Sequence, residues 1–159
     1  MTNTSNRQSS ATSAINKPIL KRGSRGELVT ELQRLLSHWN LYPQNNQDGI
    51  FDADVEVAVK AFQHRVFLIE DGVVGSKTWQ ALFSGAPVGM PVLRNGSQGQ
   101  SVLMVQRILS TTGDYRSALD GDFGPRTEAA VKAFQKRSKL TADGVVGDRT
   151  WHALSKIPH

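Results

Sequence analysis

Apolar side chains recur at helical spacing in three short stretches of the chain, and the whole pattern then recurs further along. In the first stretch Val29, Leu32 and Leu36 lie three and four residues apart. The second stretch contains A-V-K-A-F-Q and the third T-W-Q-A-L, each with its apolar residues on one side of a helix. Such stripes are typical of amphipathic helices with one buried face. The pattern therefore predicts three short helices, twice.

The repeat covers most of the chain. Both copies contain, in the same order, a D-G-x-F loop, the segment A-V-K-A-F-Q and the segment D-G-V-V-G-x-x-T-W. About half of the aligned positions are identical, and a repeat of this length is a unit of folding. We predict an all-α fold of two tandem three-helix modules, residues 19–84 and 92–157, joined by a linker at residues 85–91.

Several residues mark where the helices begin. Ser24 stands three residues before Glu27, which predicts a capping box at the start of the first helix. Asp52 is a good N-cap for the second helix, and in the other copy Pro125 suits the first helical position, where its missing N–H costs nothing. Gly75 is expected immediately before the third helix.

Residues 1–18 are rich in Ser, Thr and Asn and contain few large apolar side chains. This composition predicts a disordered polar tail. The segment lacks the apolar core of about seven or more residues that a secretory signal peptide needs, so no export signal is visible.

The chain carries 19 Lys and Arg against 14 Asp and Glu, a formal net charge of +5. A basic balance favours acidic partners such as nucleic acid, an anionic membrane or an anionic wall polymer. Bases do not cluster in runs, and no stacking aromatics alternate with them, so nucleic acid is not the expected partner. No stretch has the ~20 apolar residues of a membrane span.

The sequence offers no catalytic constellation. It contains no cysteine, which excludes disulfides and thiolate chemistry. Its four histidines fall at positions that the other copy does not share, and no zinc-protease or serine-hydrolase motif is present. We therefore predict neither an enzyme, nor a metal site, nor a cofactor.

Two kinds of polar residue recur in both copies. Each copy has two Asp-Gly pairs, where Asp suits a turn because its carboxylate bonds to nearby backbone N–H groups. The alternative is a pair of catalytic acids, as in a glycosidase. Each copy also has two glutamines beside apolar stripes. A buried glutamine must bond to the backbone of the turns, unless one amide faces a groove and binds a peptide carbonyl.

Three repeated features are candidates for the walls of a binding groove. Gly26 and Gly99, expected in the first turn of the first helix, leave room either for close packing or for a ligand at the helix N-terminus. Phe51 and Phe123 lie in the D-G-x-F loops, where core packing and groove lining are both open. The repeated arginines of the second helix fit either a ligand carboxylate or an ion pair within the module. The candidate ligand-binding residues are Gly26, Asp48, Gly49, Phe51 and Arg65, with Gly99, Asp120, Gly121, Phe123 and Arg137 in the second copy.

With G-x-x-G-x-x-V-x-x-L-Q, D-G-x-F, A-V-x-x-F-Q and D-G-V-V-G-x-x-T-W in order, each copy resembles the bacterial peptidoglycan-binding domain of the three-helix type. The first copy departs from the family by having Asp52-Ala53 in place of Gly-Pro after the D-G-x-F loop. This family is usually attached to a catalytic domain that cleaves or builds the wall, and we expect no such domain within these 159 residues.

The resemblance implies a non-catalytic protein that binds peptidoglycan, as a muropeptide or a glycan strand. Two linked modules on a repeating polymer raise avidity by ~10²–10⁴-fold. The alternatives are a protein-interaction adaptor with the same fold, whose partner is a wall hydrolase or another protein, and a targeting fragment of a wall hydrolase. The resemblance implies the cell wall or periplasm, and the cytoplasm stays open because no signal peptide is visible.

Overall fold

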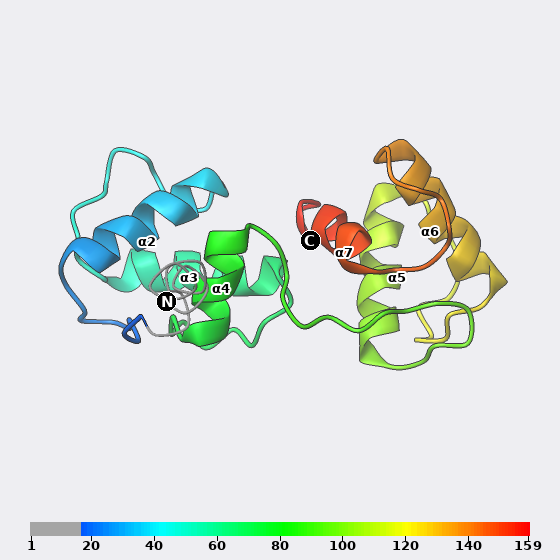
Figure 1. The fold of residues 1–159 in the computed structure, drawn as a ribbon, viewed down its shortest axis with the longest axis horizontal. Helices are drawn as coiled ribbons and strands as arrows, with labels where there is room; N and C mark the ends of the chain where they lie inside the picture. Colours follow the sequence, from blue (N-terminus) through cyan, green and yellow to red (C-terminus); the bar gives the residue numbers. More distant parts are fainter. Residues whose placement is uncertain (1–16) are drawn as a thin grey trace, which may run out of the picture. The chain divides into compact units, whose positions relative to one another are not determined.

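The computed structural model describes residues 17–159, so the predicted tail lies mostly outside the described residues. The described residues form six α-helices and four isolated β-bridges, without a longer strand. The chain divides into two compact units after Val88, and the described part of each unit holds three helices (Figure 1). The prediction of an all-α fold with two three-helix modules is confirmed.

The first module packs three helices around one core. These helices are α2 (Glu27–His38), α3 (Ala53–Arg65) and α4 (Ser76–Ser84). Leu32, Phe62 and Trp79 contribute one large side chain from each helix, and all three are fully buried. Full burial of such side chains stabilises a fold by about 1.5–3 kcal/mol each, so each of the three contributes substantially to this small core.

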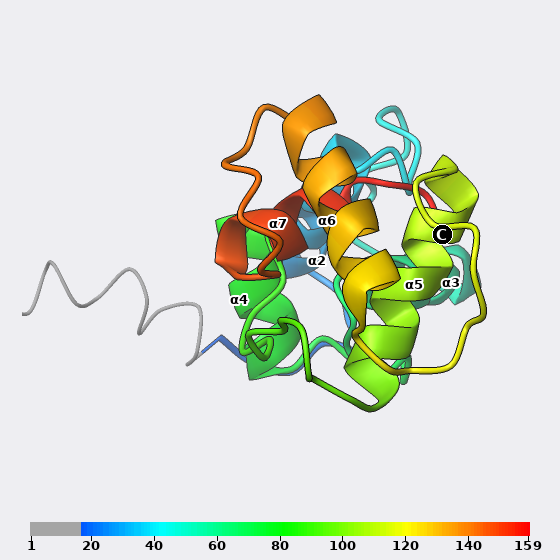
Figure 2. The same ribbon diagram turned by 90° about the vertical axis from the view of Figure 1, so that its right-hand side faces the viewer.

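The second module repeats this arrangement (Figure 2). Its helices are α5 (Gln100–Thr112), α6 (Pro125–Arg137) and α7 (Asp148–Ser155). Val105, Phe134 and Trp151 take the places of the three core residues named above, with exposed fractions of 0%, 1% and 1%. The same buried positions therefore define both copies.

Short backbone pairings hold the loops onto each helical core. Leu20 pairs with Val74 in the first module, and Leu93 pairs with Val146 in the second. The Val-Val segments thus form no more than single bridges, as their length indicates. A second bridge in each module joins the chain just before the first helix to the D-G-x-F loop.

Two prolines outside the predicted modules take part in their packing. The indole N–H of Trp79 donates to the carbonyl of Pro18 at 3.1 Å, and that of Trp151 donates to the carbonyl of Pro91 at 2.7 Å. The sequence interpretation placed these prolines in the tail and the linker. The contacts show that each module includes the residues just before its first bridge.

The predicted starts of the second and third helices are confirmed. The Asp52 carboxylate caps α3 by accepting from the Val55 N–H at 3.1 Å. Pro125 occupies the first position of α6, and Gly75 is the N-cap of α4. The replacement of Gly-Pro by Asp-Ala in the first copy therefore keeps a capped helix.

The predicted capping box at the first helix is wrong. The Ser24 hydroxyl accepts from the Lys21 N–H at 3.0 Å, and α2 begins only at Glu27, with Gly26 as N-cap at φ 123°. The reason is tertiary, because the Gly26 N–H donates to the Gly49 carbonyl at 3.0 Å. The backbone before α2 pairs with the Asp-Gly turn instead of continuing the helix, and the second copy behaves in the same way.

Candidate functional site

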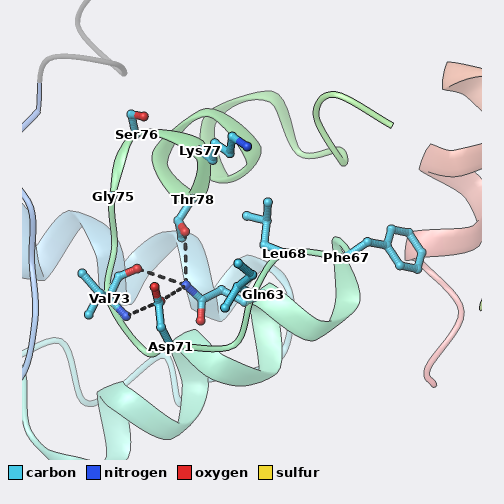
Figure 3. A pocket seen from close by; sticks show the side chains of 10 residues that line it. Gln63, Phe67, Leu68, Asp71, Val73, Gly75, Ser76, Lys77 and Thr78 are labelled. Atoms are coloured by element: carbon cyan, nitrogen blue, oxygen red, sulfur yellow. Dashed lines mark hydrogen bonds between the residues drawn. The ribbon is translucent and has the colours of Figure 1, made fainter. Parts of the chain in front are cut away.

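Each module contains two buried glutamines that hold an Asp-Gly turn, an arrangement we call the Gln–Asp-Gly clasp. In one of them the Gln63 amide N–H₂ donates to Asp71 Oδ1 at 2.9 Å and to the Val73 carbonyl at 3.0 Å (Figure 3). Its Oε1 accepts from the Gly72 N–H at 3.0 Å. The other clasps centre on Gln33, Gln106 and Gln135. The prediction that these amides bond to the turns is confirmed.

The aspartates of the clasps form turns. Asp48 Oδ1 accepts from the Ile50 N–H at 3.1 Å, which closes the turn around Gly49. Hydrogen bonds from the Gln33 amide and this N–H hold the pKa of Asp48 below its ordinary value. In the second module the N–H of Asp122 chiefly lowers the pKa of Asp120 in the same way. The turn interpretation is confirmed, since these oxygens are already hydrogen-bonded within the fold.

One clasp in each module also lines a pocket. In the first module a pocket of about 430 Å³ lies between the C-terminal end of α3 and the N-terminal end of α4 (Figure 3). In the second module a pocket of about 360 Å³ lies at the equivalent place between α6 and α7. Every residue that lines the second pocket is the counterpart of one that lines the first. The pocket therefore belongs to the module.

The pocket combines a helix N-terminus with a basic side chain. Gly75, the N-cap of α4, offers no side-chain cap, so the first turn keeps backbone N–H groups without intrahelical partners. Lys77 stands on this turn with its side chain exposed, and Arg149 is its counterpart on α7. A helix N-terminus beside a base favours an anionic group such as a carboxylate.

The two pockets differ at their rims. Ile69 lines the first pocket and is 84% exposed, whereas Thr141 takes its place in the second. Ser76, at the first position of α4, is replaced by Asp148 on α7. The first pocket is thus more apolar and the second more acidic, although both have a base at the same position.

The structure brings two of the three predicted groove walls together. The Gly26 N–H donates to Gly49 O at 3.0 Å, and the Gly99 N–H donates to Gly121 O at 2.9 Å. A Cβ at Gly26 would meet no atom within 4 Å, so packing does not explain this glycine. Its φ of 123° does, because side chains disfavour that conformation. Gly26 is therefore an N-cap, and not a residue of the first helical turn as expected.

The expectation that Phe51 and Phe123 line a groove is wrong for their side chains. Phe51 is 1% exposed and Phe123 is 2% exposed. Successive side chains of an extended segment point to opposite sides, and here Ile50 is 38% exposed while the next residue enters the core. The D-G-x-F loops therefore present their backbone and the residue before Phe at the surface.

The predicted arginines lie away from those loops. Arg65 and Arg137 end α3 and α6, whereas the D-G-x-F loops precede the first residues of the same helices. A helix of this length spans about 20 Å. The three predicted walls therefore do not meet in one groove.

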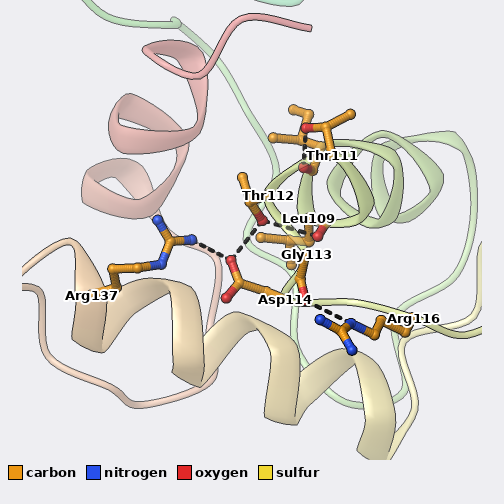
Figure 4. A network of polar contacts seen from close by, with 8 residues as sticks. Leu109, Thr111, Thr112, Gly113, Asp114, Arg116 and Arg137 are labelled. Atoms are coloured by element: carbon orange, nitrogen blue, oxygen red, sulfur yellow. Dashed lines mark hydrogen bonds and ion pairs between the residues drawn. The ribbon is translucent and has the colours of Figure 1, made fainter.

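Each of these arginines has partners within its own module. The Arg65 guanidinium lies 5.8 Å from the ring centroid of Trp39, and burial lowers its pKa. Arg137 forms an ion pair with Asp114, which also accepts from the Thr112 hydroxyl at 2.6 Å (Figure 4). The interpretation of Arg137 as a member of an ion pair within the module is confirmed.

Sequence reasoning missed the pocket residues Lys77 and Arg149. They occupy one aligned position inside the repeated block D-G-V-V-G-x-x-T-W, and both are basic. Because Lys and Arg are different residue types, a comparison by identity passes over them. A comparison by charge would have found the pair.

Two further observations bear on chemistry. Within residues 17–159, no group of three or more His, Asp or Glu side chains is placed to hold a metal ion. No helix in that part of the chain is both long and apolar enough to cross a bilayer.

A family model described as "Putative peptidoglycan binding domain" matches residues 25–82 and 98–154. Each match lies within one module, and together they cover most of the chain. The chain therefore belongs to the peptidoglycan-binding domain family, of which it contains two tandem copies.

The chain is also similar to individual proteins of known name. The chain is 30% identical over 154 residues to N-acetylmuramoyl-L-alanine amidase CwlM of Mycobacterium tuberculosis, and 31% identical over 165 residues to N-acetylmuramoyl-L-alanine amidase CwlL of Bacillus licheniformis. These alignments cover 85% and 87% of this chain but 37% and 46% of the two amidases, so it spans less than half of either. Among solved structures, the SleB N-terminal domain is 33% identical, with a TM-score of 0.42 over 43% of this chain and 94% of that one.

Proposed function

We propose that this chain binds bacterial cell-wall peptidoglycan without catalysing a reaction, through the pocket between α3 and α4 and its counterpart between α6 and α7. The supporting observation is that the same pocket recurs at the same place in two copies of a peptidoglycan-binding-family domain. The binding would take place in the cell wall or the periplasm.

The chemistry of the pocket favours the peptide part of peptidoglycan. Stem peptides carry carboxylates, and Lys77 or Arg149 beside a helix N-terminus offers a site for such a group. Leu68 and its counterpart Leu140 add an apolar wall against which a small aliphatic side chain can pack. The ligand in this proposal is a muropeptide or the stem of a longer strand.

The test is co-sedimentation of the full chain with purified sacculi from which other wall polymers have been removed. The variant Lys77→Ala/Arg149→Ala should lose about a hundredfold or more in apparent affinity, because both pockets lose a charged contact worth about tenfold each. The matched control Lys21→Ala/Arg94→Ala removes one exposed base from each module at aligned positions outside the pockets, and its retention should equal that of the parent.

The same experiment also tests the ligand contacts that we expected from the sequence. These are the loop residues Asp48 and Asp120 with the adjoining glycines, and the helix-end residues Arg65 and Arg137. If Arg65→Ala/Arg137→Ala abolishes retention and the pocket variant does not, the binding site lies at the helix ends and the pocket assignment is refuted. Absence of retention for the parent chain, with capture of one specific protein, would instead select the adaptor function.

A second candidate function is the targeting part of a wall hydrolase. The observation that favours it is that two relatives aligned with 85% and 87% of this chain are N-acetylmuramoyl-L-alanine amidases. Both functions require sacculus binding. They differ in whether addition of the chain changes muropeptide release by a wall amidase that is present in the same assay.

A further inference from the structure

The positive charge of the chain is concentrated in its second unit. Residues 89–159 contain ten Lys and Arg side chains against six Asp and Glu, whereas residues 17–88 contain eight of each. Both units form the same three-helix fold. The fold itself therefore does not require the excess of bases in the second unit.

Four of these ten bases lie on the exposed side of α6 and just after its end. We call Arg126, Lys132, Lys136 and Lys139, all of them exposed, the α6 basic face. The small exposed side chains of Ala129 and Ala133 lie among them, so a ligand can approach the helix closely. The one acidic residue of the helix, Glu128, is half-buried. Its carboxylate lies beside the Lys132 stem at the Gly144 turn, and the exposed charges of α6 are all positive.

No ion pair within residues 17–159 includes a base of the α6 basic face. The Arg126 guanidinium instead donates to the Ser117 hydroxyl at 3.4 Å. Arg137 is excluded from the face because it pairs with Asp114. Like charges one helical turn apart destabilise a helix, so an external counter-charge would stabilise this one.

The first module lacks this face. At the positions equivalent to its four bases, the first module has Asp54, Lys60 and His64 on α3 and then Phe67, so it shares only one of the bases. His64 is already hydrogen-bonded to the Glu70 carboxylate at 2.9 Å. The complete set of four bases therefore occurs in the second module and not in the first, although Lys60 repeats Lys132, whereas the pocket occurs in both modules.

The α6 basic face adjoins the pocket of the second module. A Cβ placed on Gly144 would lie 3.1 Å from Lys132 Cε, so the lysine stem runs across the Asp143-Gly144 turn. The neighbouring residues Asp143 and Val145 line the pocket between α6 and α7. An anionic chain attached to a polymer in that pocket would have the basic face beside it.

We propose that the α6 basic face binds a phosphodiester-linked anionic polymer of the bacterial wall, of the teichoic-acid type. Lys132 and Lys136 are one helical turn apart, so they match a ligand whose charges repeat about every 6 Å. A polymer with one phosphate in each repeat offers such a series, and lysine binds phosphate as a point charge. The wall source rests on family membership, while the surface itself is separate from the proposed peptidoglycan pocket.

Other polyanions fit this face less well. Single-stranded nucleic acid is bound by bases interleaved with stacking aromatic side chains, and the α6 basic face contains none. Anionic membranes are bound by helices that present large apolar side chains next to the bases, and here only Ala129 and Ala133 are present. A ligand that supplies charge alone is the best match.

The test is binding of the full chain to purified poly(glycerol phosphate) at several salt concentrations, measured by isothermal titration calorimetry. Lys132→Gln/Lys136→Gln should weaken binding about tenfold or more and reduce the slope of log K against log salt by about 1 to 2. The matched control Lys21→Gln/Lys60→Gln removes two exposed lysines of the first module and the same net charge. It should bind within about twofold of the parent.

A second variant, Arg126→Asp, introduces the residue type that the first module has at this position. It should weaken binding by a similar factor, and it replaces the lysine variant in the test if that variant does not fold. Equal weakening by the control, or no binding by the parent, overturns the proposal. Tighter binding to single-stranded DNA with the same number of phosphates, or to phosphatidylglycerol vesicles, also overturns it.

On sacculi stripped of the polymer, Lys132→Gln/Lys136→Gln should bind like the parent. A loss there would mean that the face contacts peptidoglycan itself.

Discussion

At the scale of single residues, the glutamine of each clasp stabilises the fold through the buried hydrogen bonds that it makes to a turn. Gln135 is 1% exposed, donates to the Val145 carbonyl at 2.8 Å and accepts from the Gly144 N–H at 2.9 Å. Gln135→Leu leaves these buried backbone groups unpaired, at about 1–3 kcal/mol each. We expect a loss of about 3 kcal/mol in the free energy of unfolding, measured by urea denaturation. Gln100→Leu, the same change at an exposed site, should stay within about 0.5 kcal/mol, and equal effects would contradict this role.

The clasp aspartates make stability depend on pH. Hydrogen bonds from the Asp122 N–H and the Gln106 amide lower the pKa of Asp120 in the folded state. A carboxylate with a lowered folded pKa stabilises the fold above its unfolded pKa of about 4, and this contribution is lost as pH falls through the folded pKa. An asparagine accepts the same bonds without titrating. We therefore expect the parent to lose stability relative to Asp120→Asn as pH falls from about 6 to about 3. Thermal melts at several pH values measure the difference, and a constant difference would contradict the assignment.

At the scale of elements, the entry into the first helix of each module depends on a glycine conformation. Gly99, the N-cap of α5, has φ 120° and ψ −165°, a region that only glycine adopts readily. No atom lies within 4 Å of a Cβ placed there, so Gly99→Ala tests the backbone alone. We expect a loss of about 2 kcal/mol. Gly124→Ala, at an N-cap with φ −104° and equally open space, should cost less than about 1 kcal/mol. Similar values for the two variants in urea denaturation would refute the explanation.

The helix starts also show which elements the sequence predicts. Asp52, Pro125 and Gly75 act through local geometry, and the helices that they begin are where the sequence places them. The Ser24-x-x-Glu27 pattern has the right local spacing too. However, the preceding backbone pairs with a turn more than twenty residues further along, and no local pattern reveals that pairing.

The pocket is harder to predict because it is built from different elements. Positions with the same residue in both copies, such as Gln63 and Phe51, are mainly those that the fold itself requires. Exposed rim positions of the pocket change residue type between copies, as at Lys77 and Arg149. Residues that are identical in both repeats are therefore mainly those that stabilise the fold. The residues that can contact a ligand become apparent only when α4 and α7 are seen packed against their neighbouring helices.

At the scale of the whole molecule, two pockets on one chain make binding to a repeating polymer bivalent. Binding of one module holds the other at millimolar effective concentration near the polymer, which raises avidity by ~10²–10⁴-fold. Lys77→Ala alone, or Arg149→Ala alone, should therefore lower the apparent affinity for sacculi about tenfold or more, although one pocket stays intact. Binding isotherms over a wide range of chain concentrations measure this effect. If the pockets act independently, each single variant will instead retain one class of sites that binds with the affinity of the parent chain. The advantage of having two modules would then lie in the different residues at the rims of the two pockets.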